Sequence, residues 1–330
     1  ETVQWAALGL GVVIAVASFA VYLVNRAKYS APAAPPTPQV NPGLLQRDID
    51  RRLPDQATPG MIGVLDDGRV GANDLLITLI DLAARGYLTI SPAAGPGEHW
   101  LLVRTGKDTT GLRGFETALI DAPFAGTTTT RTLDSLLADD SVVEAAITAL
   151  QHDADETGWF TRTSDSHWGK IGGALVLAGL TMLATGIIIG LNTLPAPGIA
   201  GGALVTGSGL LIATLAKMQR DHSETGYAAR GQLARYRDWL EGLSAHQLLP
   251  ENASVIFNGC VAAALAFGAS ERFATVYARA YARASGWGTV DTLPVDFDWM
   301  QGASSPAHAV HESSRFVADG LALARRYGVE

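Results

Sequence analysis

The predicted fold is decided by two apolar runs, residues 171–191, IGGALVLAGLTMLATGIIIGL, and residues 198–216, GIAGGALVTGSGLLIATLA. Neither run contains an ionisable residue, and each is close to the ~20 residues that a helix needs to cross the hydrocarbon core of a bilayer. The short break between them, residues 192–197, carries no charge and predicts a tight turn on one side of the membrane. The sequence therefore predicts a transmembrane hairpin over residues 169–217, with a buried soluble helix as the alternative for either run.

A third apolar run lies near the start of the chain. Residues 3–24 read VQWAALGLGVVIAVASFAVYLV, which is longer than the ~7–15-residue core of a signal peptide. We interpret residues 1–25 as a further transmembrane helix. Because residue 1 is Glu rather than Met, we also expect an upstream region to be missing.

Basic residues near the ends of these runs predict the orientation. Arg26 and Lys28 follow the first run, Lys170 precedes the second, and Lys217 and Arg220 follow the third. Positive flanks stay in the cytoplasm. We therefore predict a multi-pass protein of the plasma (inner) membrane with its N-terminus outside and with residues 26–168 and 218–330 cytoplasmic. The many glycines in the runs favour close helix packing over an ion pathway, which usually needs an intramembrane charge.

Composition excludes several other functions. Only 17% of the 330 residues are charged, against roughly 25% in a soluble domain, and the formal net charge is −8. A protein that binds nucleic-acid backbones needs surplus Lys and Arg. The one cysteine, Cys260, rules out an internal disulfide and a thiolate metal site.

Between the first run and the hairpin, the pattern predicts a linker and two small domains. Residues 26–60 are Pro-rich and should be extended. Residues 61–110 show a helical spacing after the candidate N-cap Asn73, a terminating Gly86, and two strand-like segments, which together are typical of a winged helix. The phrase Arg-Gly-Tyr-Leu at residues 85–88 recurs as Thr-Gly-Trp-Phe at residues 157–160, and we predict a second winged-helix-like unit over residues 111–168.

DNA binding is the obvious function for such units, but the charges oppose it. The candidate recognition helix, residues 142–154, carries Glu144 and Asp153 and has no Lys or Arg. A helix lying among phosphates should be basic. Residues 218–330 are predicted to form a helical cytoplasmic domain that contains amphipathic segments at residues 227–243 and 306–327 and a core helix at residues 253–267 with Cys260 buried. The complete predicted fold class is thus an α-helical membrane protein with three transmembrane helices, tandem winged-helix-like units and a helical C-terminal domain.

Three motifs carry a resemblance to a known family. The stretch LLITLIDLAARGYLTI at residues 75–90, the segment from Glu224 to Leu240, and Leu249-Pro250 with residues 263–273 resemble the YciQ-like predicted membrane proteins, family 2207 of the domains of unknown function. Asn252 and Ala253 depart from the family's usual Tyr-Ala pair. The resemblance implies an N-terminal extracytoplasmic domain that this chain lacks, and a LemA-like membrane coiled-coil protein as a candidate partner. It implies no catalytic residue.

No arrangement in the sequence predicts a metal or cofactor site. His308, His311 and Glu312 come closest to a metal cluster, but a zinc site would need a further ligand. Asp296 and Asp298 are more typical of capping in a loop than of acid–base catalysis.

We therefore expect a non-catalytic scaffold or assembly protein of a bacterial-type cell envelope, in contact with membrane lipids and with membrane or cytoplasmic proteins. The first alternative is a membrane enzyme or lipid-binding protein with a site at the hairpin's cytoplasmic mouth, formed by Arg220, His222, Glu224 and Arg235. The second is a membrane-tethered DNA-binding sensor. The candidate interaction residues are Leu75, Leu79, Arg85, Tyr87, Arg220, Arg235, Tyr236 and Trp239.

Overall fold

The computed structural model describes residues 52–93, 100–126, 128–160, 176–177, 180, 203–208, 222–285 and 293–329. The chain divides into two compact units, of which one comprises Glu1–Thr37 and Phe160–His222 and the other Pro38–Trp159 and Ser223–Glu330. The first unit is described only at short helical pieces and at an isolated antiparallel bridge between Phe160 and His222. The second unit, called the body below, holds every helix and strand that the structure assigns over its full length.

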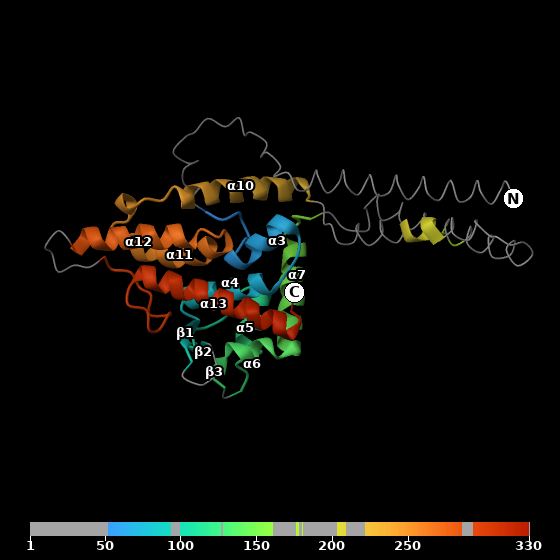
Figure 1. The fold of residues 1–330 in the computed structure, drawn as a ribbon, viewed down its shortest axis with the longest axis horizontal. Coiled ribbons are helices and arrows are strands. Elements are labelled where there is room, and N and C mark those ends of the chain that lie inside the picture. Colours follow the sequence, from blue (N-terminus) through green and yellow to red (C-terminus); the bar gives the residue numbers. More distant parts are fainter. Residues whose placement is uncertain are drawn as a thin grey trace, which may run out of the picture. The chain divides into compact units, whose positions relative to one another are not determined.

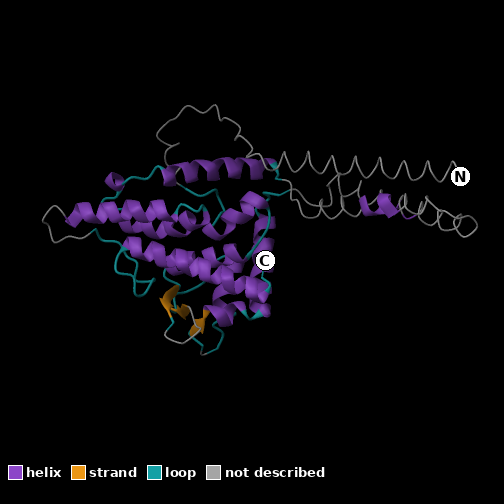
Figure 2. Ribbon diagram, viewed as in Figure 1, coloured by secondary structure: helices purple, strands orange, loops and turns teal. Residues whose placement is uncertain are grey.

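The body is helical with a small sheet (Figures 1 and 2). Its elements are, in chain order, η1 (Pro59–Met61), α3 (Ile62–Asp67), α4 (Ala72–Ala84), β1 (Leu88–Pro92), β2 (Trp100–Arg104), α5 (Gly114–Asp121), β3 (Thr130–Thr132), α6 (Leu133–Leu137), α7 (Asp140–Glu156), α10 (Glu224–Glu241), η3 (Ala245–Gln247), α11 (Ala253–Ala266), α12 (Ser270–Ser285) and α13 (Pro306–Tyr327).

Helix α4 is the centre of the body. Apart from the exposed Asn73, all of its residues are buried, including the polar Asp74 and Asp81. The helix contacts η1, α11, α13 and β1. A helix that is covered on all sides belongs to a core, because one exposed face would show polar residues. The leucine-rich pattern of α4 therefore builds the main hydrophobic core of the body.

The three strands form one antiparallel sheet in the order β1-β2-β3. Ile90 pairs with Leu102 between β1 and β2, and Leu101 pairs with Thr132 between β2 and β3. The outer edge of β1 is covered, because the Ile90 amide donates to the Trp299 carbonyl (2.7 Å) and the Ile90 carbonyl accepts from the Gln301 amide (2.8 Å). An open edge would invite pairing with another chain, and here residues 299–301 close it.

The predicted fold class is wrong for the described part of the chain. Within the ranges given above, no helix is both long enough and apolar enough to cross a membrane. The structure shows instead a mixed helical fold with a three-stranded sheet. The predicted spans, residues 3–24, 171–191 and 198–216, lie outside the described residues except for 176–177, 180 and 203–208.

The two predicted winged-helix-like units also differ from the structure. Strands β1 and β2 come from the first predicted unit and β3 comes from the second, yet all three belong to one sheet. The reason is that β2 pairs with β1 along one edge and with β3 along the other. Pairing of this kind joins distant parts of the sequence, and the local pattern of each unit does not reveal it.

The body contains chain from both sides of residues 160–222, and hydrogen bonds join the two sides. The Gly158 carbonyl accepts from the hydroxyls of Ser223 (2.6 Å) and Thr225 (2.7 Å). The Ser223 amide donates to the Trp159 carbonyl (2.8 Å). Ser223 also accepts from the Gly226 amide (3.1 Å) and so caps α10 at its N-terminus. The intervening segment therefore leaves and re-enters the body at neighbouring points.

The start of α4 is set by Asp74. The sequence favoured Asn73 as the N-cap, whereas the helix begins at Ala72 and the Asp74 carboxylate accepts from the Gly71 amide (2.9 Å). Burial raises the pKa of Asp74 to about 7, the Gly71 hydrogen bond lowers it, and the charge of Asp67 raises it further. Asp74 thus holds its proton in the folded body at a pH where an unfolded chain has lost it.

Stability should depend on pH at this carboxyl. Between about pH 4 and pH 7 the folded body keeps a proton on Asp74 that the unfolded chain releases, so raising the pH over this window lowers the free energy of unfolding. We expect Asp74→Asn to remove that part of the dependence, because an amide oxygen still accepts from Gly71. The substitution should match wild type near pH 4 and exceed it at pH 8 by on the order of 2 kcal/mol. Urea unfolding at the two pH values measures this difference, and an Asn variant that is less stable at pH 8 would contradict it.

Candidate functional site

A buried ionic cluster lies at the end of α4, where the sequence analysis placed two candidate interaction residues. Arg85 pairs with Asp81 (Nε to Oδ2, 2.9 Å) and with Glu116 of α5, and both carboxylates are nearly inaccessible. Glu116 also accepts from the Arg113 amide (2.9 Å) at the N-terminus of α5. Burial raises the pKa of Asp81 to about 6, the Arg85 charge lowers it and the Glu116 charge raises it. Arg85 therefore holds two buried acids together and joins α4 to α5.

Tyr87 continues this arrangement at the surface. The Lys107 ammonium lies 4.5 Å from the centre of the Tyr87 ring, and the Arg85 guanidinium carbon lies 5.6 Å from it. Lys107 also donates to the Arg85 carbonyl (2.8 Å). These contacts attach the segment after β2 to the end of α4. The cations are engaged with their own chain, so this cluster is structural.

The structure does not bring the remaining candidate interaction residues to one surface. Leu75 and Leu79 lie inside the core of the body. Tyr236 is buried on α10, where its ring packs on Trp239 (5.6 Å) and its hydroxyl lies 3.4 Å from the Cys260 sulfur. Arg235 is partly exposed, and Arg220 lies outside the described residues.

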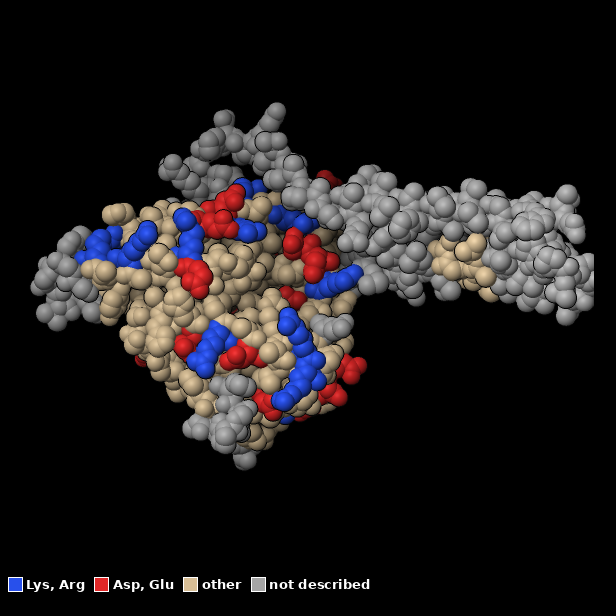
Figure 3. Space-filling model, viewed as in Figure 1, with Lys and Arg blue, Asp and Glu red and all other residues tan. Residues whose placement is uncertain are grey.

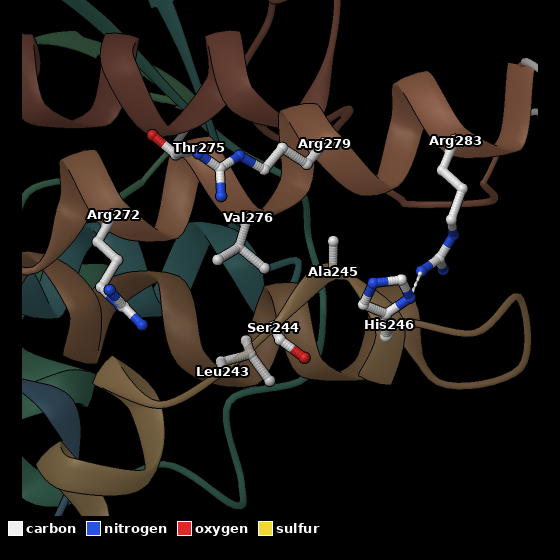
Figure 4. A pocket seen from close by; sticks show the side chains of 9 residues that line it. All are labelled: Leu243, Ser244, Ala245, His246, Arg272, Thr275, Val276, Arg279 and Arg283. Carbon is white, nitrogen blue, oxygen red and sulfur yellow. Dashed lines mark hydrogen bonds between the residues drawn. The ribbon is translucent and has the colours of Figure 1, made fainter.

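A cavity of about 550 Å³ lies between η3 and α12 (Figure 4). This volume is in the ~300–1,000 Å³ range of small-molecule sites. Its lining consists of Leu243, Ser244, Ala245, His246, Arg272, Thr275, Val276, Arg279 and Arg283. No acidic residue is among them, although the whole chain has a formal net charge of −8. We refer to this cavity as the arginine pocket.

Helix α12 aligns the three arginines. Arg272, Arg279 and Arg283 are seven and four residues apart, so at 3.6 residues per turn they point within about 20° of one direction. Phe273, Tyr277 and Ala280 are buried on an adjacent face of the helix, roughly 80–140° around its axis from the arginines, where they contact the core. The amphipathic pattern of α12 therefore anchors the helix and leaves a row of guanidinium groups facing outward.

The other wall of the pocket is a loop with a fixed shape. Gln247 accepts from the Ser244 amide (2.8 Å), and Asn252 donates to the Gln247 carbonyl (3.1 Å) while accepting from the Leu249 amide (2.8 Å). Arg283 donates to the Leu248 carbonyl (3.1 Å) and to Nδ1 of His246 (3.1 Å). A guanidinium group can only donate, so Nδ1 of His246 is the acceptor.

Arg272 and Arg279 differ from Arg283 in having no such bonds. Within the described residues neither has a hydrogen bond or an ion pair, and both side chains are exposed. The neighbouring acid Glu271 lies near His311 of α13 instead (3.7 Å), and Glu241 pairs with Arg237 (2.8 Å). Figure 3 shows Lys and Arg side chains gathered at the end of the body where Figure 1 draws α12. The pocket therefore presents uncompensated positive charge.

None of the motifs described above predicted this site. The local signal was available, because arginines at positions 272, 279 and 283 share one face of any helix that spans them. The second half of the site was not, because η3 is separated from α12 by the whole of α11 and approaches it only in the folded body.

The histidines and acids that came closest to a metal cluster in the sequence are not gathered at one point of the described residues. His308 lies 3.5 Å from Glu312 and His311 lies 3.7 Å from Glu271, so the two histidines have separate partners. Among the described residues no three His, Cys, Asp or Glu side chains are placed to hold a metal ion. Cys260 is buried as expected, and burial raises the pKa of its thiol to about 11.

The body is thus a mixed helical domain with a small antiparallel sheet and an arginine-lined cavity. A family model described as "Predicted membrane protein (DUF2207) C-terminal domain" matches residues 46–277, and the chain belongs to this family. The match confirms the resemblance carried by the motifs at residues 75–90 and 224–240, and its description supports a membrane location. No curated protein and no solved structure matches the chain.

Proposed function

We propose that this protein is a membrane-associated, non-catalytic scaffold whose body binds an anionic group of its ligand in the arginine pocket. The observation that carries the proposal is the pocket's lining, with three guanidinium groups, one imidazole and no carboxylate. Guanidinium groups suit phosphate because their N–H donors match its oxygens in pairs. Phosphate is therefore the anion that we assign to the site, either free or in a lipid headgroup.

The family supplies the membrane part of the proposal. Because the family consists of predicted membrane proteins, the body would act close to a bilayer. Lys217 and Arg220, which precede α10 in the sequence, favour the cytoplasmic side for it. There it could bind membrane or cytoplasmic proteins, and a LemA-like protein remains the candidate partner that the resemblance implies.

The two alternative functions receive less support. Helix α7 contains five acidic residues and no Lys or Arg, which opposes a role among DNA phosphates. The site proposed at the hairpin mouth includes Arg220, which lies outside the described residues, and His222, whose ring packs on Phe160 (5.1 Å) in the other unit. Helix α7 therefore lacks the positive charge that the arginine pocket offers.

Titration calorimetry tests phosphate binding directly. The full-length chain in neutral detergent should bind inorganic pyrophosphate, and Arg272→Ala with Arg279→Ala should weaken binding at least about tenfold, because each lost charge-assisted contact is worth ~1.5–3 kcal/mol. The matched control is Arg237→Ala with Arg315→Ala, which removes two arginines that pair with Glu241, Glu312 and Asp319 instead.

A second set of measurements separates the two sources of phosphate. If the ligand is a headgroup, phosphatidylglycerol in the micelles should compete with pyrophosphate, and the competition should disappear in the pocket double variant. If the ligand is free phosphate, the lipid should have no effect. Equal weakening by the pocket and control variants, or no pyrophosphate binding in wild type, would refute the assigned site.

A further inference from the structure

The arginine pocket has two positively charged ends of different character. At one end, Arg283 is held by the Leu248 carbonyl and by Nδ1 of His246, each 3.1 Å away, so its guanidinium group is already oriented. At the other end, Arg272 has no hydrogen bond or ion pair within the described residues. Figure 4 shows these two side chains at opposite sides of the cavity. Each end can therefore receive its own anion.

The space between the two ends is largely apolar. Leu243, Ala245 and Val276 line it, and Val276 and Leu243 are themselves buried. The hydroxyls of Ser244 and Thr275 are the polar side-chain groups in this part of the lining. A desolvated anion would be costly here, whereas a neutral or apolar linker would be favourable. The middle of the ligand should therefore carry no charge.

The length of the site also indicates an extended ligand. Arg272 and Arg283 are eleven residues apart on α12, which is ~16 Å along the helix axis. The cavity volume of about 550 Å³ suits a whole small molecule. Arg279 also lines a neighbouring cavity with Glu271 and His311, so its side chain lies at the rim of the arginine pocket rather than in the apolar middle.

We infer that the arginine pocket binds a small molecule with two phosphate groups separated by a neutral spacer, one phosphate at Arg283 and the other at Arg272. This inference rests on the proposed function, which requires one phosphate, and extends it to a two-ended ligand. Joining the two phosphates makes the second contact intramolecular, so a spacer that matches the distance should raise the affinity well above that of a single phosphate.

A series of α,ω-alkane bisphosphates with increasing spacer length tests the inference, with the corresponding alkyl monophosphates as the reference. Calorimetry on the full-length chain in neutral detergent should show an affinity maximum at one intermediate length, at least about tenfold above the monophosphate. Arg272→Ala should remove the affinity maximum and lower the best bisphosphate to the affinity that its monophosphate has for the same variant. Arg237→Ala, which removes an arginine outside the pocket, should change neither.

The possible failures are distinguishable. Equal affinities for the monophosphates and for bisphosphates of every length would overturn the two-ended ligand. The proposed phosphate site would then still stand. A smooth rise in affinity with spacer length, without a maximum, would also overturn it, because hydrophobic contact alone would explain the gain. An absence of binding by both kinds of phosphate would overturn the proposed function and the inference together.

Discussion

Replacing Arg85 by alanine is expected to lower the free energy of unfolding of the body by about 3 kcal/mol. Breaking a buried ion pair from one side costs ~3–5 kcal/mol, because the remaining charge has lost its partner. Two carboxylates would be left in this case, Asp81 and Glu116, with side chains 9% and 2% exposed. We take the lower end of the range because the Arg85 side chain is itself 35% exposed and partly screened by water.

The pH dependence identifies the cause of this loss. Without Arg85 the two acids face each other, so the folded body should bind at least one more proton than wild type near neutral pH, and the deficit should shrink as the pH falls toward 5. Adding Asp81→Asn to Arg85→Ala should recover part of the lost stability by the same reasoning. A deficit that stays constant between pH 5 and pH 8 would contradict an electrostatic origin.

Arg104→Ala is the matched control. Arg104 also pairs with an acid of α5, Asp121 (2.8 Å), but that carboxylate is 47% exposed. Pairs of this kind contribute ~0–1 kcal/mol. Urea unfolding of the purified chain, followed by circular dichroism, should therefore rank Arg85→Ala far below Arg104→Ala in stability. If the two variants lose similar amounts of stability, the loss comes from removing the aliphatic part of an arginine side chain and not from the unpaired buried acids.

The helices of the body were largely predictable from sequence. The spacing at residues 227–243 and 253–267 corresponds to α10 and α11, and Gly86 does adopt a positive φ (82°) just after α4. These signals are local, since they depend on one helix face or on one residue without a side chain. The apolar pattern of α4 was also visible, but a helix buried on every side differs from an interaction surface only through the elements around it. The structure places Leu75 and Leu79 inside the core, which the spacing alone does not reveal.

The sheet and the pocket could not be derived in the same way. Strand β3 has only three residues, Thr130–Thr132, and is defined by its pairing with β2 rather than by its composition. The pocket needs η3 beside α12, which depends on how α11 places both. The buried partner of Arg85 on α5, Glu116, was missed for a similar reason, because 31 residues separate the two side chains. Long-range contacts fix all three features, and a single sequence carries little direct signal for them.

Substitution of Gly320 by valine should strongly destabilise the body. Gly320 lies within α13 where that helix crosses α4, and a Cβ atom at this position would lie 2.5 Å from Cδ2 and 2.8 Å from Cδ1 of Leu76. Leu76 is fully buried and has little room to move. Overpacking of a core typically costs ~1–3 kcal/mol, and a branched side chain should fall at the upper end of that range. The missing side chain therefore permits the close contact between the two helices.

Combining Gly320→Val with Leu76→Ala tests whether the contact between these two residues causes the loss of stability. Leu76→Ala alone should destabilise the body by ~2–5 kcal/mol because it leaves a cavity. Combined with Gly320→Val, the new side chain can occupy that space, so the double variant should be more stable than the sum of the single effects by at least ~1 kcal/mol. Gly259→Val on α11 is the control, because no atom lies within 4 Å of a Cβ built there, and it should change stability by less than ~1 kcal/mol. Strictly additive effects of the Leu76 and Gly320 substitutions in urea unfolding would show that the two helices do not meet at this pair of residues.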